Sequence, residues 1–350
     1  MSERLLEVRD LKVSFATEEG VVQAVDGVSF ELEAGEVLAV VGESGSGKSV
    51  TAMTLMGLTR GPNARFEGTA RYKGTELVAA SDEELQRVRG AEIAMIFQDP
   101  MTSLNPVHRI GDQIIEQIQA HEEISDSAAR ERTVELLDRV GIPRARERVD
   151  NYPFEFSGGM RQRVMIALAL SCDPAVLIAD EPTTALDVTI QAQILQRMRN
   201  LRDETGAAVI LVTHDLGVVA DIADRIAVMY AGRIVEQGKL DEIFYDPQHP
   251  YTWGLLGSIA RVDRPRPARL PTIAGMPPSL AHRPEGCHFR PRCPHEFAEC
   301  VKTPPLESRV PASPGHKDRC WLSVEDKRGE REIVPGEIGL EDKKGAGAAV

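Results

Sequence analysis

Short, wholly apolar runs alternate with stretches of helical spacing along the chain. Residues 37–41 are continuously apolar and end at a glycine, which is typical of a buried parallel strand that leads into a loop. Similar runs at 94–97, 176–179 and 209–212 predict further buried strands, and residues 49–58 look helical. Strands that alternate with helices predict an α/β fold with a mostly parallel sheet and helices on both faces.

Two further patterns add smaller pieces to this sheet. Residues 5–15 and 24–32 also predict strands near the start of the chain. Residues 226–229 and 233–236, on either side of Ala231 and Gly232, predict a closing hairpin. Between about 106 and 171 the strand signal disappears, and the apolar residues take helical spacing. This region predicts a helical subdomain inserted into the sheet domain.

The last quarter of the chain differs in composition. We assign residues 1–250 to the main domain and 251–322, where prolines are frequent, to an irregular extension. Residues 323–350 end in small and polar side chains, so we expect a disordered tail.

Composition narrows the class of protein. With 350 residues and 42% hydrophobic content, the chain can build one large core and a smaller appendage. It shows no apolar stretch of the roughly 20 residues that cross a bilayer and no secretory signal, so we expect a cytosolic location. A net charge of -13 argues against nucleic-acid binding and against direct adhesion to anionic lipid. Any link to a membrane would therefore run through a protein partner.

A phosphate-binding loop follows the strand at 37–41. The sequence runs Gly42, Glu43, Ser44, Gly45, Ser46, Gly47, Lys48, Ser49. Glycines let backbone N–H groups surround phosphates, and the following helix adds the positive end of its dipole. Lys48 would reach the β- and γ-phosphates of a nucleotide, and Ser49 would bind Mg²⁺.

An acidic pair follows the apolar strand at 176–179. Asp180 would emerge at the carboxyl edge of the sheet, close to the P-loop, where it can hold Mg²⁺. Glu181 points differently from its neighbour and suits a general base that positions the attacking water.

The segment between these two motifs carries the family resemblance. Ser157, Gly158 and Gly159 precede a predicted helix, and Ser157 would cap it. With the P-loop before it and the acidic pair after it, this segment resembles the signature of the nucleotide-binding subunits of ABC transporters. The resemblance implies a RecA-like P-loop domain and a head-to-tail dimer of two ATPase subunits. In such a dimer the Ser157 turn would contact ATP held by the opposing subunit.

The same resemblance supplies further site residues. Gln98 matches the Q-loop glutamine that senses Mg²⁺, and His214 matches the switch histidine that contacts the γ-phosphate. Asp187 matches the D-loop at the dimer seam, and Phe15 matches the aromatic that stacks on adenine. Met160 replaces the usual glutamine of the signature, a form found in the peptide-importer branch.

Segments outside the ATPase motifs resemble one branch of the family. Residues 98–106, 246–252 and 275–280 are similar to ATP-binding subunits of oligopeptide, dipeptide and nickel importers. That resemblance implies two membrane permease subunits, an extracytoplasmic solute-binding protein and a second, related ATPase as partners. It also implies a peripheral position on the cytoplasmic face of the membrane. Peptide import is the leading interpretation, with nickel or another small solute as the alternative cargo.

Four cysteines fall within the extension: Cys287, Cys293, Cys300 and Cys320. Four thiolates can hold zinc or a [4Fe–4S] cluster. Zinc sites usually contain closely spaced cysteine pairs, so the longer gaps favour the cluster, which some members of the branch carry. A third possibility is that the four cysteines bind no metal. We expect His288, His295 and His316 to be surface residues rather than ligands.

Two functions of other classes remain open. A soluble ABC ATPase acting on DNA or ribosomes would carry a long coiled-coil insertion or a second P-loop, and neither is present. A regulator that senses iron or redox state would depend on the four cysteines. It would show ATPase activity controlled by the cluster and independent of a permease.

Overall fold

The computed structural model describes residues 4–99, 103–182, 188–259 and 272–331. Within these residues, seven strands form one sheet in the order β11-β10-β9-β3-β8-β7-β6. The bounds are β3 Val37–Val41, β6 Ile93–Ile96, β7 Val176–Asp180, β8 Ala208–Thr213, β9 Arg225–Tyr230, β10 Arg233–Lys239 and β11 Lys317–Asp318. The run from β9 to β6 is parallel, whereas β10 and β11 are antiparallel. The predicted mostly parallel α/β sheet is confirmed.

A second sheet of four antiparallel strands covers part of the first, in the order β2-β1-β4-β5. Its strands are β1 Arg4–Thr17, β2 Gly20–Glu33, β4 Ala64–Tyr72 and β5 Thr75–Glu76. The sequence analysis predicted β1 and β2 but not β4 or β5. Helix α1, Lys48–Leu55, packs with this sheet, and α2, Asp82–Val88, follows β5 in the chain.

Each buried strand contributes side chains to two hydrophobic cores, because successive side chains point to opposite faces of a sheet. In β7, Val176 and Ile178 pack with the antiparallel sheet and α1. Leu177 and Ala179 pack on the other side with helices α7, Gly158–Ala169, and α8, Val188–Thr205. Apolar neighbours therefore surround the strand that ends in Asp180 on both faces.

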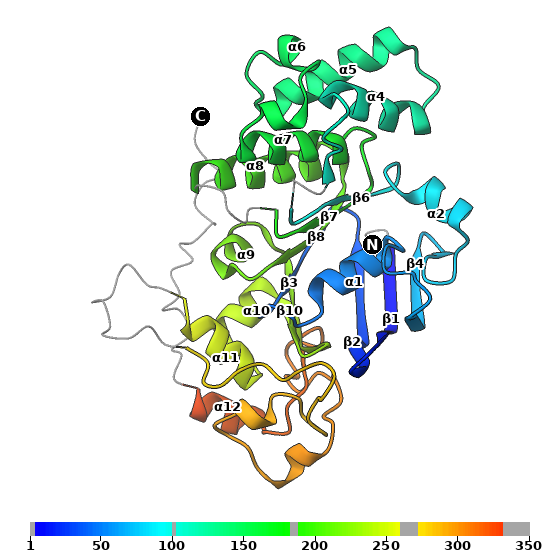
Figure 1. Ribbon diagram of the computed structural model, residues 1–350. Coiled ribbons are helices and arrows are strands. Elements are labelled where there is room, and N and C mark those ends of the chain that lie inside the picture. Colours follow the sequence, from blue (N-terminus) through cyan, green and yellow to red (C-terminus); the bar gives the residue numbers. More distant parts are fainter. Residues whose placement is uncertain (1–3, 100–102, 183–187, 260–271, 332–350) are drawn as a thin grey trace, which may run out of the picture.

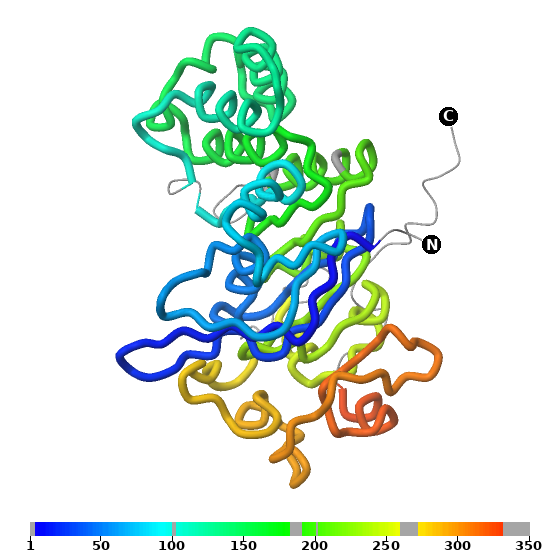
Figure 2. Tube along the Cα trace, turned by 90° about the vertical axis from the view of Figure 1, so that its right-hand side faces the viewer, coloured from blue at the N-terminus to red at the C-terminus, as the bar shows by residue number. Residues whose placement is uncertain are grey.

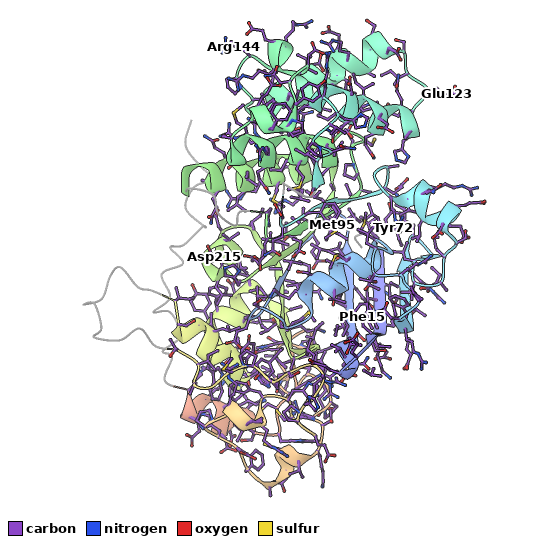
Figure 3. The ribbon with its side chains drawn as sticks, viewed as in Figure 1. Phe15, Tyr72, Met95, Glu123, Arg144 and Asp215 are labelled. Carbon is purple, nitrogen blue, oxygen red and sulfur yellow. The ribbon has the colours of Figure 1, made fainter. Side chains whose placement is uncertain are left out.

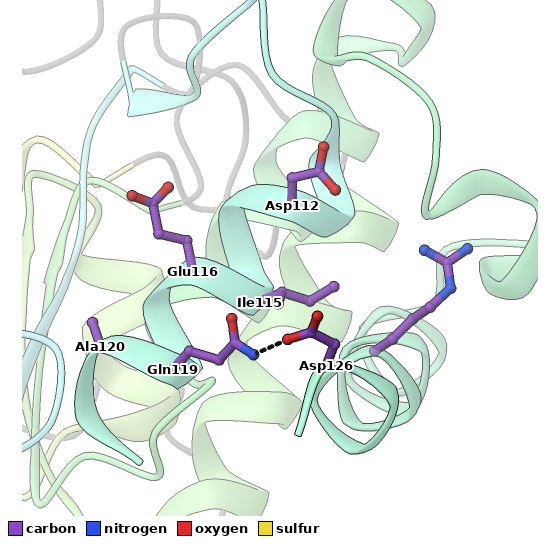
Figure 4. A pocket seen from close by; sticks show the side chains of 7 residues that line it. Asp112, Ile115, Glu116, Gln119, Ala120 and Asp126 are labelled. Atoms are coloured by element: carbon purple, nitrogen blue, oxygen red, sulfur yellow. Dashed lines mark hydrogen bonds between the residues drawn. The ribbon is translucent and has the colours of Figure 1, made fainter. Parts of the chain in front are cut away.

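The helical region forms one end of the molecule (Figures 1 and 2). It contains α4 Ile110–His121, α5 Asp126–Arg139, α6 Ala145–Arg148 and α7. The apolar spacing predicted α4, α5 and α7 but not the short α6. An open groove runs along α4 and the start of α5, and Gln119 Nε2 donates across it to Asp126 at 2.7 Å (Figure 4).

The extension forms the opposite end (Figure 2). After α9 Leu216–Ile222 and α10 Leu240–Tyr245, it begins with α11 Pro250–Gly257 and continues mostly without regular structure. β11 then pairs with β10, so the extension completes the main sheet. Helix α12, Val324–Glu330, lies in the segment that we expected to be disordered.

That expectation was wrong for residues 324–330. Lys327 of α12 is fully buried, and its Nζ lies 2.7 Å from Asp318 Oδ2. Arg331 pairs with Asp246 at 2.6 Å. Asp318 lies nine residues from Lys327, and Asp246 lies 85 residues from Arg331. The polar composition of the segment did not reveal that its charges are paired in this way.

Candidate active site

The P-loop connects β3 to α1 and is fixed by close contacts at two glycines. Gly42 has a φ of 153°, and a Cβ there would lie 2.1 Å from the carbonyl oxygen of Met229. Gly47, the N-cap of α1, has a φ of 100°, and a Cβ there would lie 2.4 Å from the carbonyl oxygen of Ala24. Both positions need glycine, because the loop is pressed against β9 on one side and β2 on the other.

Lys48 is buried at the start of α1. Its Nζ donates to the carbonyl oxygens of Gly42 at 2.7 Å and Glu43 at 3.0 Å. Burial lowers the pKa of Lys48, and the carboxylates of Glu181 and Asp180 act in the opposite direction. The Lys48 amine is thus held by two carbonyl oxygens of the loop, and a bound phosphate can replace them as its partner. Of the other loop residues, Ser46 is buried while Ser44 and Gly45 are exposed.

Ser49 and Asp180 meet, as the predicted Mg²⁺ site requires. The Oγ of Ser49 donates to Asp180 Oδ1 at 3.0 Å. Asp180 is the last residue of β7 and only 4% exposed, and burial raises its pKa. The two oxygens come from α1 and from the carboxyl edge of the sheet, which is where ligands bind in open α/β sheets.

Three side chains from adjacent strand ends converge next to Asp180. Glu181 Oε2 accepts from Gln98 Nε2 at 3.0 Å, and Glu181 Oε1 lies 3.2 Å from His214 Nδ1. These residues follow β6, β7 and β8. Glu181 has a φ of 47°, in the left-handed region, and its N–H donates to the carbonyl of Val212. The two neighbouring carboxylates have different partners, because Asp180 contacts Ser49 whereas Glu181 contacts Gln98 and His214.

The signature serine caps its helix as predicted. Ser157 Oγ accepts from the N–H of Met160 at 3.4 Å, at the start of α7. In Figure 1 this helix lies with the helical region. Its later part, at Met165, approaches the end of α1 at Met56, opposite to the end that carries the P-loop. The structure does not bring Ser157, Gly158 and Gly159 to the P-loop of the same chain. Their predicted contact with ATP held by an opposing subunit stays a prediction.

Two other predicted residues lie away from this convergence. Phe15 is a half-buried residue of β1, opposite Val22 and Ala64, and lies on the antiparallel sheet (Figure 3). Asp187 lies outside the described residues.

Gln162 was not singled out for a role. It is buried, and its Nε2 donates to the carbonyl of Pro182 at 2.8 Å. This bond ties α7 to the segment that follows Glu181. A glutamine two positions beyond Met160 was visible in the sequence, but its partner, 20 residues away, was not.

The four cysteines of the extension line one cavity, together with Phe289, His295 and Trp321. The cavity measures about 10 Å³, room for one water molecule. Burial raises the pKa of Cys293 to about 11 and that of Cys320 to about 12, so both thiols are protonated at neutral pH. Among the described residues, no group of three or more His, Cys, Asp or Glu is placed to hold a metal ion.

The predicted surface position is wrong for two of the three histidines. His316 is 2% exposed and its Nε2 lies 2.7 Å from Glu236 Oε1. His288 is 5% exposed and its Nδ1 lies 3.0 Å from the carbonyl oxygen of Ala231. Their partners lie 80 and 57 residues away, so composition gave no sign of these contacts. His295 is partly exposed beside the cysteine cavity.

Two family profiles match this chain. The profile described as "ABC transporter" matches residues 25–184, and "Oligopeptide/dipeptide transporter, C-terminal region" matches residues 235–300. The oligopeptide transport ATP-binding protein OppD of Salmonella typhimurium is 53% identical over 322 residues, 92% of this chain and 95% of that protein. The chain belongs to the oligopeptide and dipeptide branch of the ABC transporter ATP-binding subunits.

Further relatives agree with this assignment. The dipeptide transport ATP-binding protein DppD of Bacillus subtilis is 51% identical over 336 residues, 96% of this chain and 99% of that protein. Among solved structures, the ATP-binding cassette MJ0796, in a dimeric post-hydrolysis state with ADP and Pi, is 27% identical. It superposes with a TM-score of 0.62 over 67% of this chain and 99% of its own. The fold of this ABC subunit is therefore shared with a known nucleotide-binding dimer.

The described helices of this ABC subunit include none that is both long enough and apolar enough to span a bilayer.

Proposed function

We propose that this chain is the ATP-hydrolysing subunit that energises peptide import through a membrane ABC transporter. The observation that carries the proposal is the convergence of Gln98, Glu181 and His214 beside a complete P-loop. The oligopeptide and dipeptide transport names of the relatives favour peptides over nickel as the cargo.

Each side chain of the site has a distinct task. The loop amides and Lys48 bind the phosphates of ATP, and Phe15 stacks on the adenine. Glu181 accepts a proton from the attacking water. Gln98 and His214 hold its carboxylate in place, and His214 also contacts the γ-phosphate of bound ATP. Ser49, Asp180 and Gln98 would hold Mg²⁺, which neutralises charge that develops on the phosphates when it is bound.

The second half of each site comes from another ATPase subunit. Ser157, Gly158 and Gly159 lie at the amino end of α7, where the helix dipole favours a phosphate. Because they lie apart from their own P-loop, we assign them, with Asp187, to the nucleotide of the opposing subunit. The partner is a second copy or a related chain.

An apolar groove beside the Q-loop suits the permease. Met56, Met95, Phe97 and Met165 line it, where α7 faces β6 and the end of α1. Methionines adapt to helical partners because their side chains are flexible and polarisable. We assign the groove to a short cytoplasmic helix of the permease, which would place this subunit at the cytoplasmic face of the membrane. Closure of the ATPase dimer would then move that helix through α7 and Gln98.

Purification from membranes tests this function. The tagged chain should bring along two permease subunits and a second ATPase, and peptide with its binding protein should stimulate ATP hydrolysis in reconstituted vesicles. Stimulation of ATP hydrolysis by nickel instead of peptide would identify nickel as the cargo. An ATPase that purifies without membrane proteins and is unaffected by peptide would support a soluble enzyme or a regulator.

The four cysteines carry a separate proposal for the extension. We infer that Cys287, Cys293, Cys300 and Cys320 form the ligand set of a [4Fe–4S] cluster. Four thiols around one cavity support it, since a cuboidal cluster bonds each cysteine to a different iron. The cavity of about 10 Å³ is too small for a cluster, so the loops that carry the cysteines would have to separate to admit one.

Iron analysis decides this point. Protein purified without oxygen from iron-replete cells should be brown and contain iron and acid-labile sulfide. The Cys300→Ser variant should lose most of both, whereas Cys172→Ser, outside the extension, should keep them. Colourless, iron-free wild-type protein would overturn the assignment.

A further inference from the structure

Arg292 of the extension contacts the P-loop directly. Its Nη1 and Nη2 lie 2.6 Å and 3.1 Å from the two carboxylate oxygens of Glu43, the second residue of the loop. The Arg292 side chain is only 4% exposed, and 249 residues separate the two partners. A two-pronged contact of this kind fixes orientation as well as distance.

Tyr251 of α11 reaches the backbone of the same loop residue. The N–H of Glu43 donates to the Tyr251 hydroxyl oxygen at 2.9 Å. Tyr251 is fully buried, and burial raises its pKa, so the hydroxyl keeps its proton. The extension therefore holds Glu43 both by its side chain and by its main chain.

Glu43 passes this restraint on to the catalytic lysine. Its carbonyl oxygen is one of the two that accept from Lys48 Nζ, at 3.0 Å. A third contact comes through the β9–β10 turn. His288 binds the carbonyl of Ala231, and the N–H of Gly232 donates to the carbonyl of Ser46 at 2.9 Å.

The extension also holds Arg292 itself in place. Arg292 Nε donates to the carbonyl of Ala274 at 2.9 Å, and Nη1 donates to the Tyr230 hydroxyl at 3.3 Å. The Tyr230 ring packs against Tyr251, with centroids 4.6 Å apart, and against Phe289 at 5.2 Å. Phe289 also lines the cysteine cavity. These neighbours orient the Arg292 guanidinium independently of its contact with Glu43.

We propose that Arg292 is a positioning residue of the ATP site, which sets the shape of the P-loop through Glu43. The inference rests on the proposed ATP binding by this loop. Arg292 touches neither Lys48 nor the Gln98, Glu181 and His214 group, so its loss should weaken ATP binding and leave the chemical step intact. A pre-shaped loop binds more tightly because less ordering remains to be done when the ligand arrives.

The test compares Arg292→Met with Arg290→Met in the full-length chain. Arg290 lies in the same short turn, but its partner is Glu296. Arg292→Met should raise the Kd and KM for ATP about tenfold, the loss expected for a hydrogen bond to a charged group, with kcat at saturation within about twofold. Arg292→Lys keeps the charge without the fork and should fall between the two. Arg290→Met should bind ATP as the wild type does.

Glu43→Gln and the double variant Glu43→Gln/Arg292→Met complete a thermodynamic cycle. If Arg292 acts through Glu43, the double variant binds ATP no more weakly than the weaker single variant. Wild-type affinity in a folded Arg292→Met protein, or losses that add in the double variant, would overturn the proposal. If Arg292→Met fails to fold, Glu43→Gln must still weaken ATP binding, and unchanged affinity there overturns it as well. A wild-type chain that does not bind ATP would instead refute the proposed function.

Discussion

The two sides of the nucleotide site differ in how they are held. On the P-loop side, the loop is pressed between β2 and β9, and the extension binds Glu43. On the catalytic side, Gln98 and His214 each contact Glu181, and the His214 side chain is 62% exposed. We call these the braced side and the open side.

The comparison teaches how the work of the site is divided. The braced side can bind phosphate with little rearrangement, because buried contacts already fix its backbone. The open side depends on Gln98 and His214, which are exposed, and on Glu181 between them, which is partly buried. A second subunit could enclose the exposed pair. Binding and hydrolysis should therefore respond to different substitutions.

The sharpest way to separate the two sides is Glu181→Gln. Loss of the general base should lower turnover by about 10²–10⁴-fold, while ATP binding stays at wild-type strength. Bound ATP should then hold two ATPase subunits together. ATPase rates, ATP affinity and sedimentation with ATP measure these effects. Glu123→Gln, at an exposed position of the helical region, is the control. Rapid turnover by Glu181→Gln would remove Glu181 from its assigned role.

Lys327→Met tests whether the braced side depends on a folded extension. Removing one partner of a buried ion pair typically costs about 3–5 kcal/mol, although Arg309, 3.2 Å from Asp318, offsets part of that loss. The free energy of unfolding in denaturant should fall, and ATP affinity should fall with it. Lys302→Met, exposed in the same extension, should leave both unchanged. Equal stability in the two variants would contradict the role of the buried pair.

Acid should weaken the braced side through His249. Its Nδ1 accepts from the N–H of Tyr251, which needs the neutral ring, and burial lowers its pKa from 6.5 to about 3. Above pH 6.5 the His249 ring is neutral in both the folded and the unfolded chain, so its bond with Tyr251 contributes fully to stability. As the pH falls from 6.5 towards 3, the unfolded chain gains a proton that the folded chain does not, so stability falls.

The slope should approach about 1.4 kcal/mol per pH unit within that window. In His249→Asn the side-chain oxygen can still accept, but nothing titrates, so the difference between pH 7 and pH 5.5 should shrink. His108→Asn, at an exposed site, should keep the wild-type slope. An unchanged slope in His249→Asn would show that other groups cause the acid sensitivity.

The smallest expected effect comes from the signature cap. Ser157→Ala removes an N-cap and should cost about 1 kcal/mol of stability. Ser125→Ala removes the equivalent cap of α5 and should cost a similar amount. Only Ser157→Ala should also weaken ATP-driven dimer formation, measured by light scattering. Equal dimer formation by both variants would place Ser157 outside the shared site.

On the open side, the acidic pair at a strand end indicated Glu181, whereas Gln98 and His214 were assigned through the family resemblance. Gln98, Glu181 and His214 each follow a short apolar run, and parallel strands bring their carboxyl ends to one edge. The P-loop was equally clear, since its glycines meet steric requirements that the structure now shows at Gly42 and Gly47. The roles given to these side chains stay predictions, because their distances do not measure chemistry.

Other elements were missed for physical reasons. The strand β4 has few apolar residues, because much of it faces solvent. Helix α8 mixes apolar and polar residues along its length, although Gly206 directly follows its last residue. The braced side was harder still. Glu43 and Arg292 are 249 residues apart, and nothing in either local sequence indicates that they meet.

The pairing of β11 with β10 has a consequence for anyone who shortens the chain. Glu236 faces Asp318 and Gln237 faces Lys317 across this pair. A protein cut before residue 316 would expose the hydrogen-bonding edge of β10 and remove His316, the partner of Glu236. Exposed edges recruit strands from other molecules. A shortened protein should therefore aggregate rather than remain a soluble ATPase.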